Sequence, residues 1–453
     1  MKTKKILASA VSLSLAAAAL AVSPVCRAAA ATYSTTKADG VNSTVLNKYL
    51  VMDAAANVPN AEFTFTVAPG AAVAADTANG KLAVLAGVGS PALTNGTMTF
   101  SSGDTATAEA DKGTDTPVFR TAEDTADEKY VKKQLTLDFS SVAFTEPGVY
   151  RYIITEAGTN QGITNGYSDG ELTRTLDVYV YDAGTTDTEG KPQLMISGYV
   201  MYEGTVTAAP NADKAADKEE TDKPNGAEVT GAAKNNSITN LYDSCDLTFS
   251  KTVTGNQGSK DKYFAFTVKI ENAVAGSVFD VSYANADASV SANPNAATTC
   301  ITSDVAQPAK LYMTADGISA VSEDNAGVTE KEFTFYLQHG QSIEILGLAK
   351  GTKYTVTEAP EDYTPSAVIT GDTKTGDASS EGTAIALADN AMTDDYIQDD
   401  TVIDFTNNRQ GVIPTGILST LAGSLCLAAV GIAGIAGGAY YVKKKKSEDD
   451  GKE

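Results

Sequence analysis

Histidine is almost absent from this sequence: among its 453 residues, only His339 is a histidine. A single histidine excludes metal sites that need several histidines, and it weakens any serine–histidine or cysteine–histidine catalytic arrangement. Neither a phosphate-binding loop nor a metal-ligand spacing is found in the rest of the sequence. The sequence therefore argues against an enzyme that acts on an external substrate, and it predicts no cofactor and no metal.

Basic residues are also in short supply. The chain contains 34 lysines and arginines against 57 aspartates and glutamates, which gives a formal net charge of -23 at pH 7. Nucleic acid binding needs a basic surface that neutralises phosphates, so the composition argues against a nucleic acid partner. A strongly acidic surface instead suits a soluble protein on the outside of a cell.

Residues 1–31 have the pattern of a secretory signal peptide. Three lysines among the first five residues precede an uncharged apolar run over residues 6–22, and four alanines follow at residues 28–31. A basic start, an apolar middle and small residues at the cleavage site are typical of such leaders. Cleavage is expected at the end of the alanine run, and an uncleaved membrane anchor is the alternative.

The C-terminal end combines three segments in a fixed order. A motif segment at residues 409–416 is followed by an uncharged run over residues 417–442, which is long enough to span a bilayer. Residues 443–453 then begin with four lysines, which favour a cytoplasmic end. An ordinary single-span membrane protein is the alternative to a tail that is cut off.

The motif segment ends in a pentapeptide that resembles a sortase sorting signal. Its residues are Val412, Ile413, Pro414, Thr415 and Gly416. Pro414 favours an extended peptide because proline fixes its own φ and biases the residue before it. The common signal has a residue between proline and threonine, whereas this one resembles the Val-Pro-Thr-Gly variant of streptococcal T-antigen-type pilins. The resemblance implies that a sortase cysteine attacks the Thr415 carbonyl, Gly416 leaves, and an amine accepts the acyl group.

Cysteine is scarce, and two of the four cysteines lie in the terminal segments expected to be removed. Only Cys245 and Cys300 remain in the mature chain. Export permits a disulfide between them. The sequence does not decide whether they pair.

The mature chain is predicted to be all-β. Stretches with helical periodicity are scarce, and short alternating or apolar runs bounded by Gly, Asn, Asp and Pro recur instead. Examples are residues 63–67, 135–139, 172–181 and 333–337. Short strands at such spacing, with turn residues between them, predict antiparallel β-sandwiches.

An internal repeat divides the chain into two domains. In each copy a short segment of mixed apolar and polar residues ends in a lysine, and a Phe-x-Phe-Thr-Val segment follows. A Thr-Glu pair and a Thr-Asn pair come later in each copy. We place the first domain at residues 32–240 and the second at residues 241–408. The first contains an insertion at residues 209–235 that is rich in Ala, Asp, Glu and Lys, and it is expected to be a flexible, solvated loop.

Three polar residues in each copy are predicted to face the core. Successive side chains of a strand point to opposite sides of a sheet, so each of these residues shares a face with its apolar neighbours two positions away. The residues are Lys48, Glu156 and Asn240 in the first copy and Lys251, Glu358 and Asn407 in the second. Buried charges are costly unless they are paired or neutralised, so this repeated placement calls for a specific use.

Isopeptide chemistry supplies such a use. Burial lowers the pKa of a lysine and raises that of a glutamate, so both groups favour their neutral forms. A neutral amine is a nucleophile for the side-chain carbonyl of asparagine. A protonated glutamate can polarise that carbonyl and pass protons to the departing ammonia. The product is a lysine–asparagine isopeptide bond that forms once, without turnover.

At this point the chain resembles the two-domain backbone pilins of the streptococcal T-antigen type over nearly all of its mature length. The junction over residues 240–251 and the box at residues 357–360 carry the resemblance, while the matching box at residues 155–158 departs from it at its last position. The resemblance implies immunoglobulin-like domains related to collagen-adhesin B-type modules. It also implies isopeptide bonds Lys48–Asn240 and Lys251–Asn407, with Glu156 and Glu358 as catalysts.

The resemblance further implies a covalent polymer. The acceptor amine for Thr415 is predicted to be Lys234, and the competing lysines are Lys214, Lys218 and Lys223. The partners implied are pilin-type (class C) and housekeeping sortases, further copies of the subunit, and peptidoglycan of a Gram-positive cell wall; no host surface ligand is readable from the residues. The alternatives are a monomeric wall-anchored adhesin and a secreted binding protein held only by its membrane span.

Overall fold

A computed structural model describes residues 32–120, 127–167, 169–211, 229, 232–285, 310–315, 326–371, 384–387 and 391–412. Apart from two single-turn 3-10 helices, η1 (Thr77–Asn79) and η2 (Glu109–Asp111), all regular structure in these residues is β-strand. The all-β prediction is therefore confirmed. Within these ranges no helix is long and apolar enough to cross a membrane. The predicted leader at residues 1–31 and the predicted span at residues 417–442 lie outside them.

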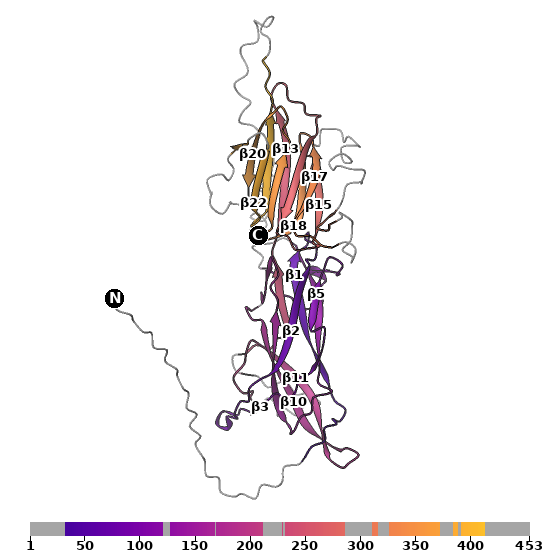
Figure 1. The fold of residues 1–453 in the computed structure, drawn as a ribbon. Coiled ribbons are helices and arrows are strands. Elements are labelled where there is room, and N and C mark those ends of the chain that lie inside the picture. Colours follow the sequence, from indigo (N-terminus) through magenta and orange to yellow (C-terminus); the bar gives the residue numbers. More distant parts are fainter. Residues whose placement is uncertain are drawn as a thin grey trace, which may run out of the picture.

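Two sheets form the N-terminal half of the elongated molecule (Figure 1). The first has the order β4-β7-β1-β12-β9, with β6 at the side of β7. The second has the order β11-β10-β8-β2-β5, with β3 at the side of β8. The strands are β1 (Ser43–Asp53), β2 (Ala61–Pro69), β3 (Val84–Ala86), β4 (Ala92–Thr94), β5 (Thr97–Phe100), β6 (Thr107–Ala108), β7 (Glu128–Asp138), β8 (Gly148–Ala157), β9 (Ile163–Thr164), β10 (Thr173–Thr186), β11 (Pro192–Glu203) and β12 (Ser237–Tyr242).

Two further sheets form the C-terminal half, which lies end to end with the first (Figure 1). Their orders are β16-β15-β18-β13-β23-β20-β21 and β17-β14-β19-β22. The strands are β13 (Ser244–Thr254), β14 (Phe264–Glu271), β15 (Val278–Asn285), β16 (Lys310–Tyr312), β17 (Lys331–Leu337), β18 (Gln341–Ala349), β19 (Lys353–Glu358), β20 (Thr364–Thr370), β21 (Ala384–Ala386), β22 (Ala391–Tyr396) and β23 (Thr401–Asn408). We refer to the two halves below as the first and second domains.

Each pair of sheets encloses its own hydrophobic core. Leu46 of β1 and Phe63 of β2 are fully buried in the first core, and Phe249 of β13 and Phe266 of β14 are fully buried in the second. On β2 the buried and exposed positions alternate at first, as expected for a strand with one face on the core. The core side of each sheet therefore follows from the alternation in the sequence.

In both domains the first strand and the last strand are neighbours and run parallel. β1 pairs with β12 in the first domain, and β13 pairs with β23 in the second. The remaining pairings of these domains are antiparallel, except for the short β3 beside β8. The parallel pairing places the start and the end of each domain side by side.

The junction between the domains is short and packed. β12 ends at Tyr242 and β13 begins at Ser244, so one residue separates the strands. The Tyr242 hydroxyl donates to the Gly347 carbonyl at 2.8 Å, and the Asn60 side chain donates to the Ala275 carbonyl at 2.9 Å. The two domains are therefore joined by a one-residue connection and by hydrogen bonds between them.

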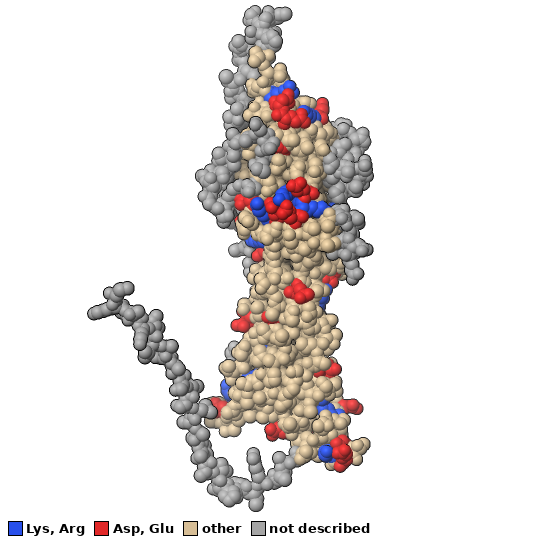
Figure 2. Space-filling model, viewed as in Figure 1, with Lys and Arg blue, Asp and Glu red and all other residues tan. Residues whose placement is uncertain are grey.

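On the visible face of the molecule, lysines and arginines lie close to aspartates and glutamates (Figure 2). Ion pairs of the described residues agree with this view: Lys269 lies 3.1 Å from Glu271 and 2.6 Å from Glu330. Much of the visible face of the first domain is uncharged (Figure 2). The acidic excess of the chain is thus partly balanced by local pairs, which contribute little stability because they are solvated.

Candidate functional site

A buried polar site lies between the two sheets of the first domain. Lys48 on β1, Glu156 on β8 and Asn240 on β12 meet there, and none is more than 2% exposed. The Lys48 ammonium lies 2.9 Å from Glu156 Oε2, and Asn240 Nδ2 donates to Glu156 Oε1 at 2.7 Å. Glu156 therefore contacts both the lysine and the asparagine from the opposite sheet.

Strand register explains how the lysine and the asparagine come to share this site. Leu50 of β1 is opposite Asn240 of β12, so Lys48 lies two residues before the position opposite the asparagine. Residues two apart on a strand face the same side of the sheet, so both side chains point into the core. The ring of Phe63 forms one wall, with its centroid 4.5 Å from the Lys48 amine.

The second domain repeats this arrangement. Lys251 on β13, Glu358 on β19 and Asn407 on β23 are each fully buried. The Lys251 ammonium pairs with Glu358 Oε1, and Asn407 Nδ2 donates to the same oxygen at 2.8 Å. Val253 is opposite Asn407, which gives the same two-residue offset, and the Phe264 ring centroid lies 4.5 Å from the lysine amine. The inward orientation of all six side chains, predicted from strand alternation, is confirmed.

Burial shifts the pKa values of both lysines and of Glu358 in the direction that favours their neutral forms. Desolvation lowers the pKa of Lys48 to about 8, although the Glu156 carboxylate opposes this shift and Arg174 adds to it slightly. Desolvation likewise lowers the pKa of Lys251 to about 8 against the opposing charge of Glu358. The pKa of Glu358 is raised by burial, with Lys251 and Asn407 opposing the rise. Both lysines are thus far easier to deprotonate than a solvated lysine.

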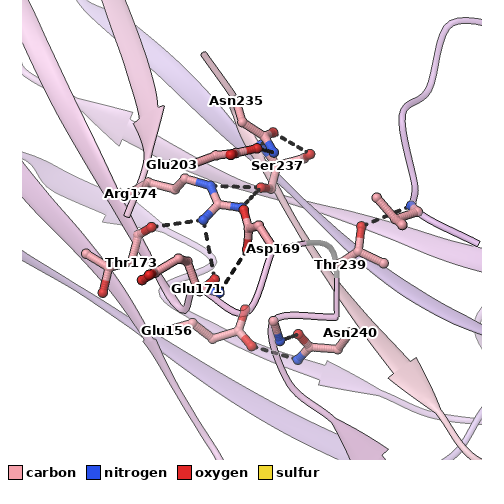
Figure 3. A network of polar contacts seen from close by, with 12 residues as sticks. Glu156, Asp169, Glu171, Thr173, Arg174, Glu203, Asn235, Ser237, Thr239 and Asn240 are labelled. Carbon is pink, nitrogen blue, oxygen red and sulfur yellow. Dashed lines mark hydrogen bonds and ion pairs between the residues drawn. The ribbon is translucent and has the colours of Figure 1, made fainter. Parts of the chain in front are cut away.

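The Asn240 side chain of the first site has further partners on a neighbouring turn. Its Nδ2 also donates to Asn165 Oδ1 at 2.8 Å, and its Oδ1 accepts from the backbone N–H of Gly166 at 2.9 Å. Figure 3 shows Glu156 and Asn240 pointing toward each other. The sequence prediction missed Asn165 and Gly166, because the segment between β8 and β10 has no strand or helix periodicity.

Arg174 of β10 holds that turn against β12 (Figure 3). Its guanidinium is fully buried and donates to the Ser237 carbonyl at 2.6 Å and to Asp169 Oδ2 at 2.7 Å. Ser237 belongs to β12, three residues before Asn240, and Asp169 follows the turn that carries Gly166. Burial lowers the pKa of Arg174, and the Asp169 carboxylate is the largest opposing influence. The sequence prediction did not include this arginine.

The remaining predicted residues are only partly within the described ranges. Lys234 is exposed and lies in a backbone bridge with Tyr202 at the end of β11. Val412 is 90% exposed, whereas Ile413, Pro414, Thr415 and Gly416 lie outside the described residues, as do Lys214, Lys218 and Lys223. Cys245 is buried and forms no disulfide among the described residues, and Cys300 lies outside them.

In each domain a lysine, a glutamate and an asparagine are buried in contact between two sheets. The lysine lies on the first strand and the asparagine on the last. This arrangement defines a class of domains suited to an internal isopeptide bond. Comparisons with known proteins agree with this class. Residues 45–243 match the family model described as the Spy0128-like isopeptide containing domain. Residues 245–409 match a second model, described as a domain of unknown function.

Similarity to individual proteins extends over most of the chain. A pilin of Streptococcus pyogenes serotype M1 is 26% identical over 425 residues, which is 93% of this chain and 95% of that protein. The crystal structure of the major pilin from Streptococcus pyogenes is 22% identical with a TM-score of 0.43 and covers 83% of this chain and 100% of its own. The T-13 major pilin of Streptococcus pyogenes is 20% identical with a TM-score of 0.40, covering 81% and 99%. The resemblance to the streptococcal major pilins is confirmed by the similarity to the curated pilin and by the match of residues 45–243 to the Spy0128-like model.

Proposed function

We propose that the chain is a structural pilus subunit whose two domains, immunoglobulin-like in type, each form an internal lysine–asparagine isopeptide bond. The observation that carries this proposal is the buried contact of lysine, glutamate and asparagine at the same register offset in both domains. The bonds proposed are Lys48–Asn240 and Lys251–Asn407. Apart from these single-turnover reactions, no enzymatic activity is proposed.

The proposed reaction is an amide exchange within the core. The neutral lysine amine attacks the asparagine Cγ, the Nζ–Cγ bond forms, and the Cγ–Nδ2 bond breaks. The protonated glutamate delivers its proton to Nδ2, which leaves as ammonia, and takes a proton back from the attacking amine. The lysine pKa of about 8 at each site favours the reaction, because a larger fraction of the amine is neutral than at a solvated site.

Intact-mass measurement of the mature chain tests these bonds. We expect the mass of the wild-type chain to fall short of its sequence mass by one ammonia for each bond, two in all. Asn240→Ala and Asn407→Ala should each restore one ammonia. Asn408→Ala is the matched control, because Asn408 adjoins Asn407 but is exposed. A wild-type chain with its full sequence mass would refute the isopeptide proposal.

We further propose that sortases join Thr415 to an amine of the next subunit and, at the base of the polymer, to peptidoglycan. A pilin-type (class C) sortase would form the polymer and a housekeeping sortase the wall anchor, which places the subunit on the surface of a Gram-positive cell. The likeness to a curated pilin over 93% of the chain supports a surface polymer. A monomeric wall-anchored adhesin remains the alternative function.

Lys234 is the acceptor that we propose for this intersubunit bond. Its neighbours fix its backbone to the end of β11: the Glu203 N–H donates to the Ala233 carbonyl at 3.0 Å, and the Asn235 N–H donates to the Met201 carbonyl at 3.1 Å. The Asn235 side chain also donates to Glu203 Oε1 at 2.9 Å. An exposed lysine on a fixed backbone suits an enzyme that must bring its side chain to a thioester, because little backbone flexibility is lost on docking.

Denaturing gels of cell-wall extracts distinguish the polymer from the adhesin. Wild-type cells should give a ladder of covalent multimers, and Thr415→Ala should remove the ladder. Lys234→Ala should also remove it, whereas Lys81→Ala, a control on an unrelated lysine of the first domain, should leave it intact. A single wild-type band that depends on Thr415 would favour the adhesin. A ladder that persists in Lys234→Ala would assign the acceptor role to another lysine.

A further inference from the structure

Both the nitrogen and the oxygen of the Asn240 carboxamide are hydrogen-bonded. Its two N–H groups donate hydrogen bonds to Glu156 Oε1 and Asn165 Oδ1, and its oxygen accepts one from the Gly166 N–H. Because the nitrogen faces two acceptors and the oxygen faces a donor, the network fixes which way the amide points. The amide is therefore held in a single orientation before any reaction begins.

Local structure explains why Asn165 and Gly166 lie beside Asn240. β9 ends at Thr164, which pairs with Leu241 of β12, and the Tyr167 N–H then donates to the Thr239 carbonyl at 2.8 Å. The turn between these two anchors thus passes directly beside Asn240. Gly166 has a φ of 63°, a left-handed conformation that favours glycine, and it turns the chain there.

The Asn165 side chain bridges both ends of the site. Its Nδ2 donates to the Gly158 carbonyl at 2.6 Å, two residues after the catalytic glutamate, while its Oδ1 accepts from Asn240 Nδ2. The turn is fixed on its other side by Arg174, through Asp169. The partners of the Asn240 amide are consequently tied to the strands that carry Glu156 and Asn240.

We propose that Asn165 and the Gly166 backbone N–H are catalytic groups for the Lys48–Asn240 bond. When Lys48 attacks Cγ, negative charge develops on Asn240 Oδ1, and the Gly166 N–H is already hydrogen-bonded to that atom. A donor fixed at a developing oxyanion lowers the barrier without reorganisation. Asn165 Oδ1 accepts from Nδ2 and stabilises it as it gains a proton and leaves as ammonia. This inference rests on the isopeptide proposal above.

The second domain provides an internal reference for this inference. Asn407 Nδ2 donates to Glu358, but among the described residues no donor reaches the buried Asn407 Oδ1. The residue opposite Asn407 on the neighbouring strand β20 is Pro365, which has no N–H. The structure therefore contains one isopeptide site with an oxyanion donor and one site at which the described residues supply none.

Timed refolding of the mature chain (residues 32–415) tests the roles of these groups. Chain recovered from inclusion bodies is kept unfolded in denaturant, diluted into buffer, quenched at intervals, digested, and analysed by mass for the two crosslinked peptides. We expect Asn165→Ala to slow the first bond at least tenfold and to leave the rate of the second bond unchanged. Asn165→Asp retains an acceptor oxygen toward Nδ2 and should recover most of the rate lost in the alanine variant.

A backbone substitution tests the oxyanion donor. Replacing Gly166 by glycolic acid in cell-free synthesis removes one N–H and keeps the chain length, and we expect a loss of about 10–100-fold in the rate of the first bond. Wild-type rates in Asn165→Ala and in the ester variant would overturn the inference while leaving the isopeptide proposal standing. Failure of the wild-type chain to form the first bond at all would instead overturn the isopeptide proposal. The rate of the second bond serves as the internal control for refolding conditions in every variant.

Discussion

The two domains carry the same buried lysine, glutamate and asparagine in different surroundings. In the first, Asn240 is enclosed by Asn165, the Gly166 N–H and the network of Arg174. In the second, the lysine amine lies near two phenylalanine rings, and the described residues offer Asn407 Oδ1 no donor. Yet burial lowers the pKa of the lysine to about 8 in both domains. Burial is thus the main cause of the lowered lysine pKa in both domains, and most contacts of the additional network in the first domain are made with the asparagine and its turn.

The largest expected effect comes from removing each proposed isopeptide bond in turn. Asn240→Ala and Asn407→Ala would each reopen a loop of roughly 150–200 residues, and the chain-entropy treatment of crosslinks gives a loss of about 5 kcal/mol of unfolding free energy per bond. Chemical denaturation followed separately for each domain measures this loss. If the two domains depend equally on their bonds, the losses should match. A loss of unfolding free energy in one domain only would show that the bond stabilises that domain and that its counterpart does not stabilise the other.

A smaller effect is expected from Arg174→Met. The substitution leaves the Ser237 carbonyl and Asp169 without their buried partner, which should cost the first domain about 3 kcal/mol of unfolding free energy. The unfolding transition of the second domain should not move. Arg409→Met is the control, because its pair with Asp362 is exposed and is worth at most about 1 kcal/mol. Equal losses in these two variants would mean that Arg174 is not a specific support of the first site.

The pH dependence of bond formation in the second domain should be bell-shaped. The reactive form, with neutral Lys251 and protonated Glu358, holds one proton between the pair. Above the lysine pKa of about 8 the pair loses that proton, so the rate should fall about tenfold per pH unit. Below the pKa of Glu358, which burial raises, the pair gains a second proton and the amine becomes charged.

Refolding rates at a series of pH values, with the crosslinked peptide as the readout, give this profile. A rate that keeps rising above pH 8 would show that the glutamate reacts in its ionised form. The same measurement on the first domain sharpens the comparison, because its lysine has the same pKa of about 8. Similar alkaline limits with a faster maximum in the first domain would assign the difference to the partners of Asn240.

The smallest effect is expected at the junction that the two domains share. Tyr242→Phe removes the hydrogen bond to the Gly347 carbonyl, which should cost about 1 kcal/mol and separate the two unfolding transitions slightly. Tyr181→Phe is the control, because Tyr181 is exposed. Calorimetry of the mature chain measures both variants. An unchanged profile for Tyr242→Phe would indicate that the domains unfold independently.

The sequence could predict the strands and the six buried polar residues, because strand alternation fixes which face a residue occupies and a repeat provides two readings of one pattern. It could not predict that Tyr49 and Val51, on the opposite face of β1 from Lys48, are also buried. They pack in a separate cluster with Tyr130 and Leu241. Strand alternation predicts that one face of a strand is buried. The burial of the second face of β1 depends on segments that are distant in the sequence, so alternation does not predict it.

Asn165, Gly166 and Arg174 were missed for a related physical reason. The turn is placed by hydrogen bonds to β12, such as that from the Tyr167 N–H to the Thr239 carbonyl, and such long-range pairings have no periodic signature. Arg174 is a fully buried arginine inside a strand, where sequence reasoning expects an apolar residue. The polar groups that support the first site from this turn and from β10 are therefore visible only in the three-dimensional structure.

The single residue between β12 and β13 has a consequence for proteolysis. Proteases nick exposed loop tips that can be drawn out into an extended form, and connections between domains are their usual targets. Here Asp243 is the whole connection, its N–H donates to the Gly162 carbonyl at 2.6 Å, and its carbonyl accepts from Lys350. Between Asn240 and Lys251 the chain passes from one domain to the next without an accessible loop. The junction between the two domains is therefore expected to resist proteases that cut extended linkers.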